Sequence, residues 1–235
     1  MSNYKKILFT GSTGRFGALF KSFFDSKKYI YPTRKELDIT SKKSIKKFIV
    51  KKKPDLVIHC AALSRPMDVH EKEISKSILT NIIGTANLVR ECEEKNIKII
   101  YFSTSHVYPG TKGNYSEIDN LNPINNYAWS KLGGECAVQM YKNSLILRIS
   151  MTQNPFIHKQ AYKNLKTNFM FHDDVIKIIP KLLKYKGVIN IGGPIQSVYD
   201  FAKKFNPKIK GINLKMKKNL NISMNISKLK KILND

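Results

Sequence analysis

A tyrosine and a lysine four residues apart, Tyr127 and Lys131, are the side chains of this sequence best suited to proton transfer. Residues at this spacing lie on the same side of a helix, so the phenol and the ammonium come together. A phenol with its ordinary pKa of about 10 exchanges protons poorly at neutral pH, and a nearby cation favours its ionised form. The pair predicts an acid-base site, although in a lysine-rich chain the same spacing also arises on a solvated helix face.

Hydroxyl groups follow an apolar segment upstream of this pair. The run from Ile97 to Phe102 predicts a buried strand, and Thr104 comes directly after it. Ligands of parallel sheets bind beyond the carboxyl ends of the strands. We therefore expect Thr104 to hydrogen-bond the same substrate oxygen that Tyr127 protonates, and Ser105 and His106 to face the substrate.

A glycine-rich loop lies near the N-terminus, between a short apolar run and a helical pattern. Its spacing is G-x-x-G-x-x-G, and a strand, a tight turn and a helix are the context in which a dinucleotide fold binds its pyrophosphate. A simple tight turn is the alternative. The residues expected to contact a cofactor here are Gly11, Thr13, Gly14, Arg15, Phe16 and Gly17.

The segment after the second predicted strand bears on the choice of cofactor. Arg34 stands where a base meets the 2′-phosphate of NADP, whereas NAD enzymes usually carry an acid there. Arg34 therefore favours NADP, and NAD stays possible. Asp38 and Ile39, a few residues on, are expected to contact the adenine.

Strands and helices alternate along the chain. Apolar runs predict strands at residues 5–10, 29–31, 55–62, 97–102, 145–149 and 187–191, with helices expected between most of them. This alternation indicates an α/β fold, a Rossmann-type doubly wound parallel sheet. We expect a dinucleotide-binding domain over 1–150 and a short substrate-binding region over 151–235 that partly returns to the sheet at 187–192. The stretch after Asn206 shows only a Lys/Asn bias.

The composition carries one anomaly, a net charge of +25. Lysines are spread along the chain and only five residues are Arg, which does not indicate a specific nucleic-acid site. Three widely spaced cysteines without a C-x-x-C pair predict neither a metal site nor disulfides, and no segment has the length of a membrane span. We expect a cytoplasmic protein with no membrane partner.

With these motifs the sequence resembles the extended short-chain dehydrogenase/reductase superfamily, most closely its dTDP-4-dehydrorhamnose reductase and GDP-fucose synthase branches. The resemblance covers about the first 150 residues. It is carried by 10–17, Arg34 with 37–40, 59–62, 103–110, 122–123, 127–131 and 134–135, and more weakly by 172–175 and 188–193.

The resemblance implies a catalytic triad of Thr104, Tyr127 and Lys131. Tyr127 is then the general acid/base, Lys131 binds the nicotinamide ribose, and Thr104 polarises the C4 oxygen of the sugar. It also implies a nucleotide-sugar substrate and a homodimer formed through the helix of Tyr127 and the preceding long helix. The further residues expected around the cofactor are Cys60, Ala61, Ala62 and Asn81, the last at a position that the superfamily often uses structurally.

The two residues after Thr104 narrow the choice of reaction. Related 4,6-dehydratases carry an Asp-Glu pair there, and this chain has Ser105-His106, which counts against a dehydratase. We expect an NADP-dependent reductase of a nucleotide-linked 4-keto-6-deoxy sugar. A 4-epimerase with tightly bound NAD is the alternative. Because the segment 150–171 is short for a substrate region, a non-catalytic dinucleotide-binding or regulatory subunit also stays open.

Overall fold

The computed structural model describes residues 4–215 and 220–234. The centre of the molecule is a six-stranded parallel sheet. Residues 1–3, 216–219 and 235, which fall within the two regions expected from the sequence, lie outside the described part. The strand order is β10-β5-β4-β3-β1-β2. The strands are β1 (Ile7–Thr10), β2 (Tyr29–Ile30), β3 (Leu56–His59), β4 (Lys98–Thr104), β5 (Ser144–Ile149) and β10 (Gly187–Ile191).

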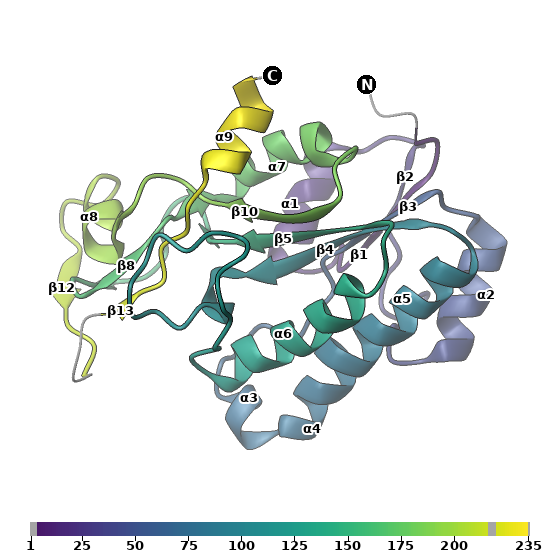
Figure 1. Cartoon of the computed structure of the whole chain (residues 1–235), viewed down its shortest axis with the longest axis horizontal. Coiled ribbons are helices and arrows are strands. Elements are labelled where there is room, and N and C mark those ends of the chain that lie inside the picture. The colour runs from purple at the N-terminus through teal and green to yellow at the C-terminus, as the bar shows by residue number, and fades with distance from the viewer. Residues whose placement is uncertain (1–3, 216–219, 235) are drawn as a thin grey trace.

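Helices cover both faces of this sheet (Figure 1). One face is covered by α1 (Arg15–Phe23), α7 (His172–Leu182) and α9 (Ser227–Asn234), and the other by α2 (Lys42–Lys52), α5 (Gly84–Glu94) and α6 (Asn126–Gln139). Alternate residues of each strand enter the two cores: Ile7 and Phe9 pack towards α1, and Leu8 packs towards α2. The expected α/β, doubly wound fold is confirmed.

The chain reverses its winding direction between β1 and β3. From β1 it moves outwards to β2, then crosses to the other side of β1 and continues through β3, β4 and β5. Ligands of such sheets bind at this switch point, beyond the carboxyl ends of the two strands. The glycine loop after β1 and residues 60–62 after β3 border that position.

The long helix expected ahead of the helix of Tyr127 is interrupted. It consists of α4 (Ile74–Ser77), a π-helical segment η1 (Ile78–Ile83) and α5, and the short α3 (Val69–Lys72) precedes it. Asn81 lies in the π-helical segment, where its side chain leaves the helix to bond neighbouring elements. The apolar period of the sequence predicts a helix here and carries no sign of the wider turn.

A small lobe of short strands lies at the carboxyl edge of the sheet, at the left of Figure 1. It is built on the buried residues Phe156, Ala161, Phe171, Val198, Phe201, Ala202 and Ile209. Its elements are β6 (Met151–Thr152), β7 (Gln160–Tyr162), β8 (Leu165–Thr167), β9 (Met170–Phe171), β11 (Gln196–Ser197), α8 (Val198–Lys203), β12 (Lys210–Ile212) and β13 (Leu220–Asn221), and the 3-10 turn η2 (Ser105–Val107) ends beside it.

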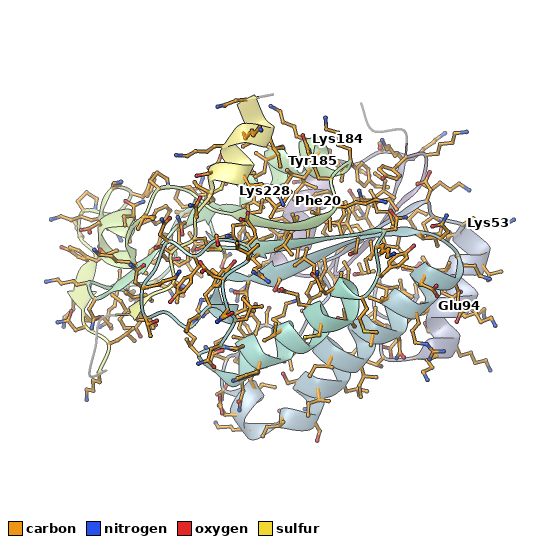
Figure 2. The ribbon with its side chains drawn as sticks, in the orientation of Figure 1. Phe20, Lys53, Glu94, Lys184, Tyr185 and Lys228 are labelled. Atoms are coloured by element: carbon orange, nitrogen blue, oxygen red, sulfur yellow. The ribbon has the colours of Figure 1, made fainter. Side chains whose placement is uncertain are left out.

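The chain beyond residue 150 contributes to both parts of the molecule. Besides β10, which the sequence led us to expect in the sheet, α7 and α9 also join the main core, where Leu229 and Ile232 are buried. The stretch after Asn206 is therefore folded in its described part, where the lysines are exposed and Asn221 and Asn225 are half-buried. Figure 2 shows Lys53 and Lys184 projecting outwards from different sides of the fold, and Phe20 pointing inwards.

Candidate active site

The glycine loop is fixed by close backbone contacts. Gly11 has φ +84°, and a Cβ there would lie 2.6 Å from the backbone nitrogen of Ala61. A Cβ on Gly17 would lie 2.1 Å from the carbonyl oxygen of Gly11. Side chains at these two positions are excluded, so the loop can pass tightly from β1 to α1 and touch the loop after β3.

Gly14 differs from these two glycines. It is the N-cap of α1, its side-chain position meets only the Gly11 oxygen at 3.4 Å, and no side chain caps the helix. Open space therefore lies above the first backbone N–H groups of α1, an arrangement that accepts a phosphate. This cradle fits the pyrophosphate of a dinucleotide.

A single cavity of about 1360 Å³ runs from this loop to the small lobe. It exceeds the upper limit of roughly 1,000 Å³ for sites of one small ligand, so it has room for a dinucleotide and a second molecule. Most of the residues expected around a cofactor line it: Gly11, Thr13, Gly14, Arg15, Phe16, Gly17, Arg34, Asp38, Ile39, Cys60, Ala61 and Ala62.

Hydrogen bonds hold the side chains of two further expected cofactor residues, Asp38 and Asn81. Asp38 accepts hydrogen bonds from the backbone N–H and the hydroxyl of Thr40, which lower the pKa of its carboxyl, as does the nearby charge of Arg34. Asn81, by contrast, does not line the cavity. Its amide bonds the backbone of Leu63 and the hydroxyl of Ser130, and so joins the loop after β3 to α6.

Thr104, Tyr127 and Lys131 all line the cavity, at its middle. Thr104 ends β4, and Asn125 caps α6 by accepting a hydrogen bond from Ala128 at 2.8 Å, which places Tyr127 in the first turn. Lys131 follows one turn later, and its Nζ lies 4.1 Å from the centroid of the Tyr101 ring, a cation–π contact. The structure therefore brings the three expected residues together.

The ionisation of the pair differs from the sequence expectation. Burial raises the pKa of Tyr127 to about 12, against the influence of Thr104 and Arg65, which lower it. Burial lowers the pKa of Lys131 to about 8, while Cys60 and Glu135 raise it. The pKa of the phenol is therefore raised and not lowered, because burial outweighs the groups that favour the phenolate. At neutral pH Tyr127 is a protonated donor beside a largely charged Lys131.

A buried polar network underlies the three residues. Arg148 donates to Glu135 Oε1 at 2.6 and 3.0 Å, and Ser103 donates to Glu135 Oε2 at 2.6 Å. Arg148 also donates to the hydroxyl of Tyr108 at 2.8 Å. The pair with Glu135 raises the pKa of Arg148 despite burial. Since Ser103 precedes Thr104 and Glu135 follows Lys131 by one turn, the network fixes β4 and α6 relative to each other.

Ser105 and His106 also line the cavity, on the side of the small lobe. Burial lowers the pKa of His106 to about 4, and its Nδ1 has no hydrogen-bond partner among the described residues. A neutral His106 is thus available to a bound ligand. The cavity is also lined by Gln153, Phe156 and His158 of the lobe, by His172 at the start of α7 and by Arg65 from the loop after β3. The sequence did not single out Phe156 or His158.

Sequence reasoning also missed the pairing of Glu135 with Arg148. Glu135 stood out only as part of a motif, and nothing in the spacing to Arg148 indicates contact. For Arg65 a signal existed, because arginine is rare in this chain. Among the described residues, no group of three or more His, Cys, Asp or Glu side chains is arranged to hold a metal ion.

A doubly wound parallel sheet with a glycine cradle after β1 and a Tyr-x-x-x-Lys pair on the helix after β4 defines an extended short-chain dehydrogenase/reductase. The comparisons with known proteins agree. The chain belongs to the RmlD substrate binding domain family, whose model matches residues 5–170.

Two kinds of relatives have similar sequences. Methionine adenosyltransferase 2 subunit beta of Xenopus tropicalis is 33% identical over 143 residues, 57% of this chain and 42% of the relative. The dTDP-4-dehydrorhamnose reductase of Aggregatibacter actinomycetemcomitans is 30% identical over 202 residues, 82% of this chain and 63% of the relative. The chain thus spans about half of the length of the first of these relatives, and under two thirds of the second.

Solved structures resemble the whole described fold. A hypothetical dTDP-4-dehydrorhamnose reductase from Sulfolobus tokodaii has a TM-score of 0.84 and 25% identity, covering 97% of this chain and 94% of that one. The dTDP-4-dehydrorhamnose reductase from Bacillus anthracis, solved in complex with NADP, has a TM-score of 0.86 at 20% identity, covering 100% and 93%. At that identity the second likeness shows the fold alone.

Proposed function

We propose that this protein is an NADPH-dependent reductase of a 4-keto sugar carried by a nucleoside diphosphate. One observation carries the proposal: Thr104, Tyr127 and Lys131 line the same cavity as an open glycine cradle, and the cavity has room for two ligands. Relatives named dTDP-4-dehydrorhamnose reductase and dTDP-4-keto-6-deoxy-D-glucose reductase support the substrate class.

The residues divide the chemistry between them. NADPH, when bound, supplies the hydride for the carbonyl carbon. Tyr127 donates its phenolic proton to the carbonyl oxygen, and Thr104 donates a hydrogen bond to the same oxygen. The pKa of about 12 keeps Tyr127 protonated until the oxygen becomes basic enough to take the proton. Lys131 orients the nicotinamide ribose and stabilises the phenolate left behind.

NADP is the preferred cofactor in this proposal, and NAD is possible. Arg34 is exposed at the cavity edge near Asp38, and among the described residues it forms no ion pair with a carboxylate, so its guanidinium is available to a 2′-phosphate. We expect Arg34→Ala to weaken NADPH binding by about 10-fold or more and NADH binding little, measured by nicotinamide fluorescence.

The decisive test is oxidation of NADPH in the presence of dTDP- and GDP-linked 4-keto-6-deoxy sugars. In Tyr127→Phe we expect kcat to fall by about 10²- to 10⁴-fold while the Kd for NADPH stays unchanged, because only the proton donor is removed. Absence of NADPH binding to the wild-type protein at micromolar concentration would defeat the proposal at its first step.

A second candidate is a dinucleotide-binding subunit of another enzyme. The relatives named methionine adenosyltransferase 2 subunit beta favour it, because two of them match 57% and 62% of this chain at 33% and 31% identity. Tight NADPH binding without turnover of any 4-keto sugar nucleotide, in the wild type and in Tyr127→Phe alike, would support this candidate over the reductase.

A homodimer in the cytoplasm completes the proposal. Ile74, Ile78, Leu79 and Ile83 on the α4–η1 helix are each 42–51% exposed, and Trp129 on the adjoining α6 is 51% exposed. An apolar patch of this kind is typical of an interface. The described cysteines are free, as in a reducing compartment, and no described helix has the length and apolar character to cross a bilayer. Sedimentation of the wild type and of Ile78→Asp tests the dimer, and cell fractionation tests the location.

A further inference from the structure

Arginine is scarce in this chain and is concentrated at the cavity. Of 42 basic residues five are Arg, and three of these, Arg15, Arg34 and Arg65, line the cavity. Arg148 belongs to the buried network, and Arg90 is on α5, outside the cavity lining. Lysine provides nearly all of the positive surface charge, whereas the planar guanidinium of arginine is suited to bidentate phosphate binding. The cavity is therefore enriched in the side chain that is best suited to phosphate recognition.

The three cavity arginines lack protein counter-charges. Within the described part of the chain, Arg148 is the arginine that forms an ion pair with a carboxylate, and the other four form none. Arg15 donates a hydrogen bond at 3.2 Å, but to the neutral oxygen of Gln153. A bound ligand with several negative charges would balance the positive charges of these arginines. In the proposed function the cofactor already accounts for two of them, Arg15 in the glycine loop and Arg34 after β2.

Arg65 lies in the loop after β3, outside the glycine loop and the segment after β2. This loop contains Ala61, which contacts Gly11, and continues to His70, whose ring lies edge-on to that of Tyr127 with centroids 5.2 Å apart. Arg65 therefore belongs to the segment that joins the glycine cradle to the proton donor. In agreement, its charge lowers the pKa of Tyr127, although burial outweighs this effect.

We propose that Arg65 binds the diphosphate of the nucleotide-sugar substrate and is the main determinant of substrate affinity in the cavity. This inference rests on the proposed function. In such a substrate the diphosphate is attached at C1, across the sugar ring from the C4 carbonyl. A cation in the same cavity near Tyr127 can meet it, and Arg65 is the cavity arginine on the loop that continues to His70, whose ring contacts Tyr127.

The lobe lysines are the competing cations. Lys159 lines the same cavity and is exposed, and Lys163 is exposed next to the Tyr199 ring. An ammonium is a strongly hydrated point charge without the fork of donors that holds two phosphate oxygens. Lys159→Gln therefore makes a matched control, because it removes one positive charge from the same cavity without removing a guanidinium.

The experiment is isothermal titration of dTDP, UDP and GDP into the full chain saturated with NADP⁺. For the tightest of the three probes, we expect Arg65→Gln to weaken binding by about 10- to 100-fold, the range of a lost charge-assisted hydrogen bond. Arg65→Lys is expected to restore part of the loss, and Lys159→Gln to change affinity by less than about threefold. The Kd for NADPH should stay the same in all variants, and because Arg65 is exposed the variants should melt like the wild type.

Three outcomes would overturn the inference: no binding of any probe by the wild type, equal losses in Arg65→Gln and Lys159→Gln, or a weakened Kd for NADPH with unchanged probe binding. The last would make Arg65 a cofactor ligand. The experiments distinguish failure of this inference from failure of the proposed reductase function. Arg65-dependent binding of a nucleoside diphosphate without NADPH oxidation retains the site and removes the reductase, whereas turnover with an unchanged KM in Arg65→Gln does the reverse.

Discussion

The two ends of the cavity are built in different ways. At the dinucleotide end, backbone contacts around Gly11 and Gly17 leave few positions that can move or change, and the buried Glu135–Arg148 network does the same beneath the catalytic residues next to it. At the lobe end the walls are short strands, and the polar side chains of Arg65, His158 and Lys159 are exposed. The difference indicates that the residues for catalysis and cofactor binding are held rigidly. The choice of the second ligand depends instead on a few side chains at the lobe end, where the supporting core is small.

The largest expected effect tests the rigid end. In Glu135→Ala the guanidinium of Arg148 is left buried without its partner, so we expect a loss of about 3–5 kcal/mol in the free energy of unfolding. Asp68→Ala, which breaks an exposed pair with Lys72, should cost less than about 1 kcal/mol. Urea denaturation measures both. Similar small losses in the two variants would mean that the network does not hold the site.

Two phenylalanines compare the cores directly. Phe20 is fully buried under the sheet and stacks on Phe9 with ring centroids 4.4 Å apart, and Phe201 is buried in the lobe. We expect Phe20→Ala to destabilise the whole chain by about 3–5 kcal/mol, and Phe201→Ala to destabilise mainly the lobe by about 3 kcal/mol. In Phe201→Ala, faster hydrogen exchange should then be confined to residues 151–171 and 196–215, and NADPH binding should be retained. In Phe20→Ala, exchange should be faster throughout the chain. Faster exchange throughout the chain in Phe201→Ala as well would show one cooperative unit.

A smaller effect is expected where the cavity meets the glycine cradle. The Cβ of Gly14→Ala clashes with no protein atom but fills space over the α1 N-terminus, so we expect NADPH binding to weaken by about 10-fold with an unchanged melting temperature. Fluorescence titration and a thermal melt give the two numbers. Unchanged affinity would mean that the pyrophosphate does not approach this position.

The smallest effect is a pH dependence. Since burial lowers the pKa of Lys131 to about 8, the ammonium is lost as pH rises through that value, and kcat/KM should fall to about half its plateau near pH 8. Glu135 raises the pKa of Lys131, so Glu135→Gln should move this limb to lower pH. A profile that stays flat to pH 10 would contradict a role for the charged lysine.

The sequence predicts the dinucleotide end far better than the lobe, for a physical reason. Gly11, Gly17, Tyr127 and Lys131 act through local geometry, a turn or one helical turn, so spacing alone places them. Arg65 and His158 line the same cavity only because segments distant in sequence fold against each other, and no local pattern predicts that. The ionisation of Tyr127 is missed for a related reason, because the burial that sets it depends on the whole fold.

The described segment 220–225 has a consequence for how the protein is made. Tyr115 exchanges backbone hydrogen bonds with Ser223 and Asn225, its ring stacks on Tyr108, and Met224 packs beside both rings. These contacts hold the loop that carries Ser105 and His106 in place. The residues that make them, in 220–225, are synthesised long after that loop. A nascent chain can form the dinucleotide cradle early, but the substrate side of the active site closes only after residues 220–225 have been synthesised, so chains truncated before residue 220 are expected to bind a cofactor and turn over nothing.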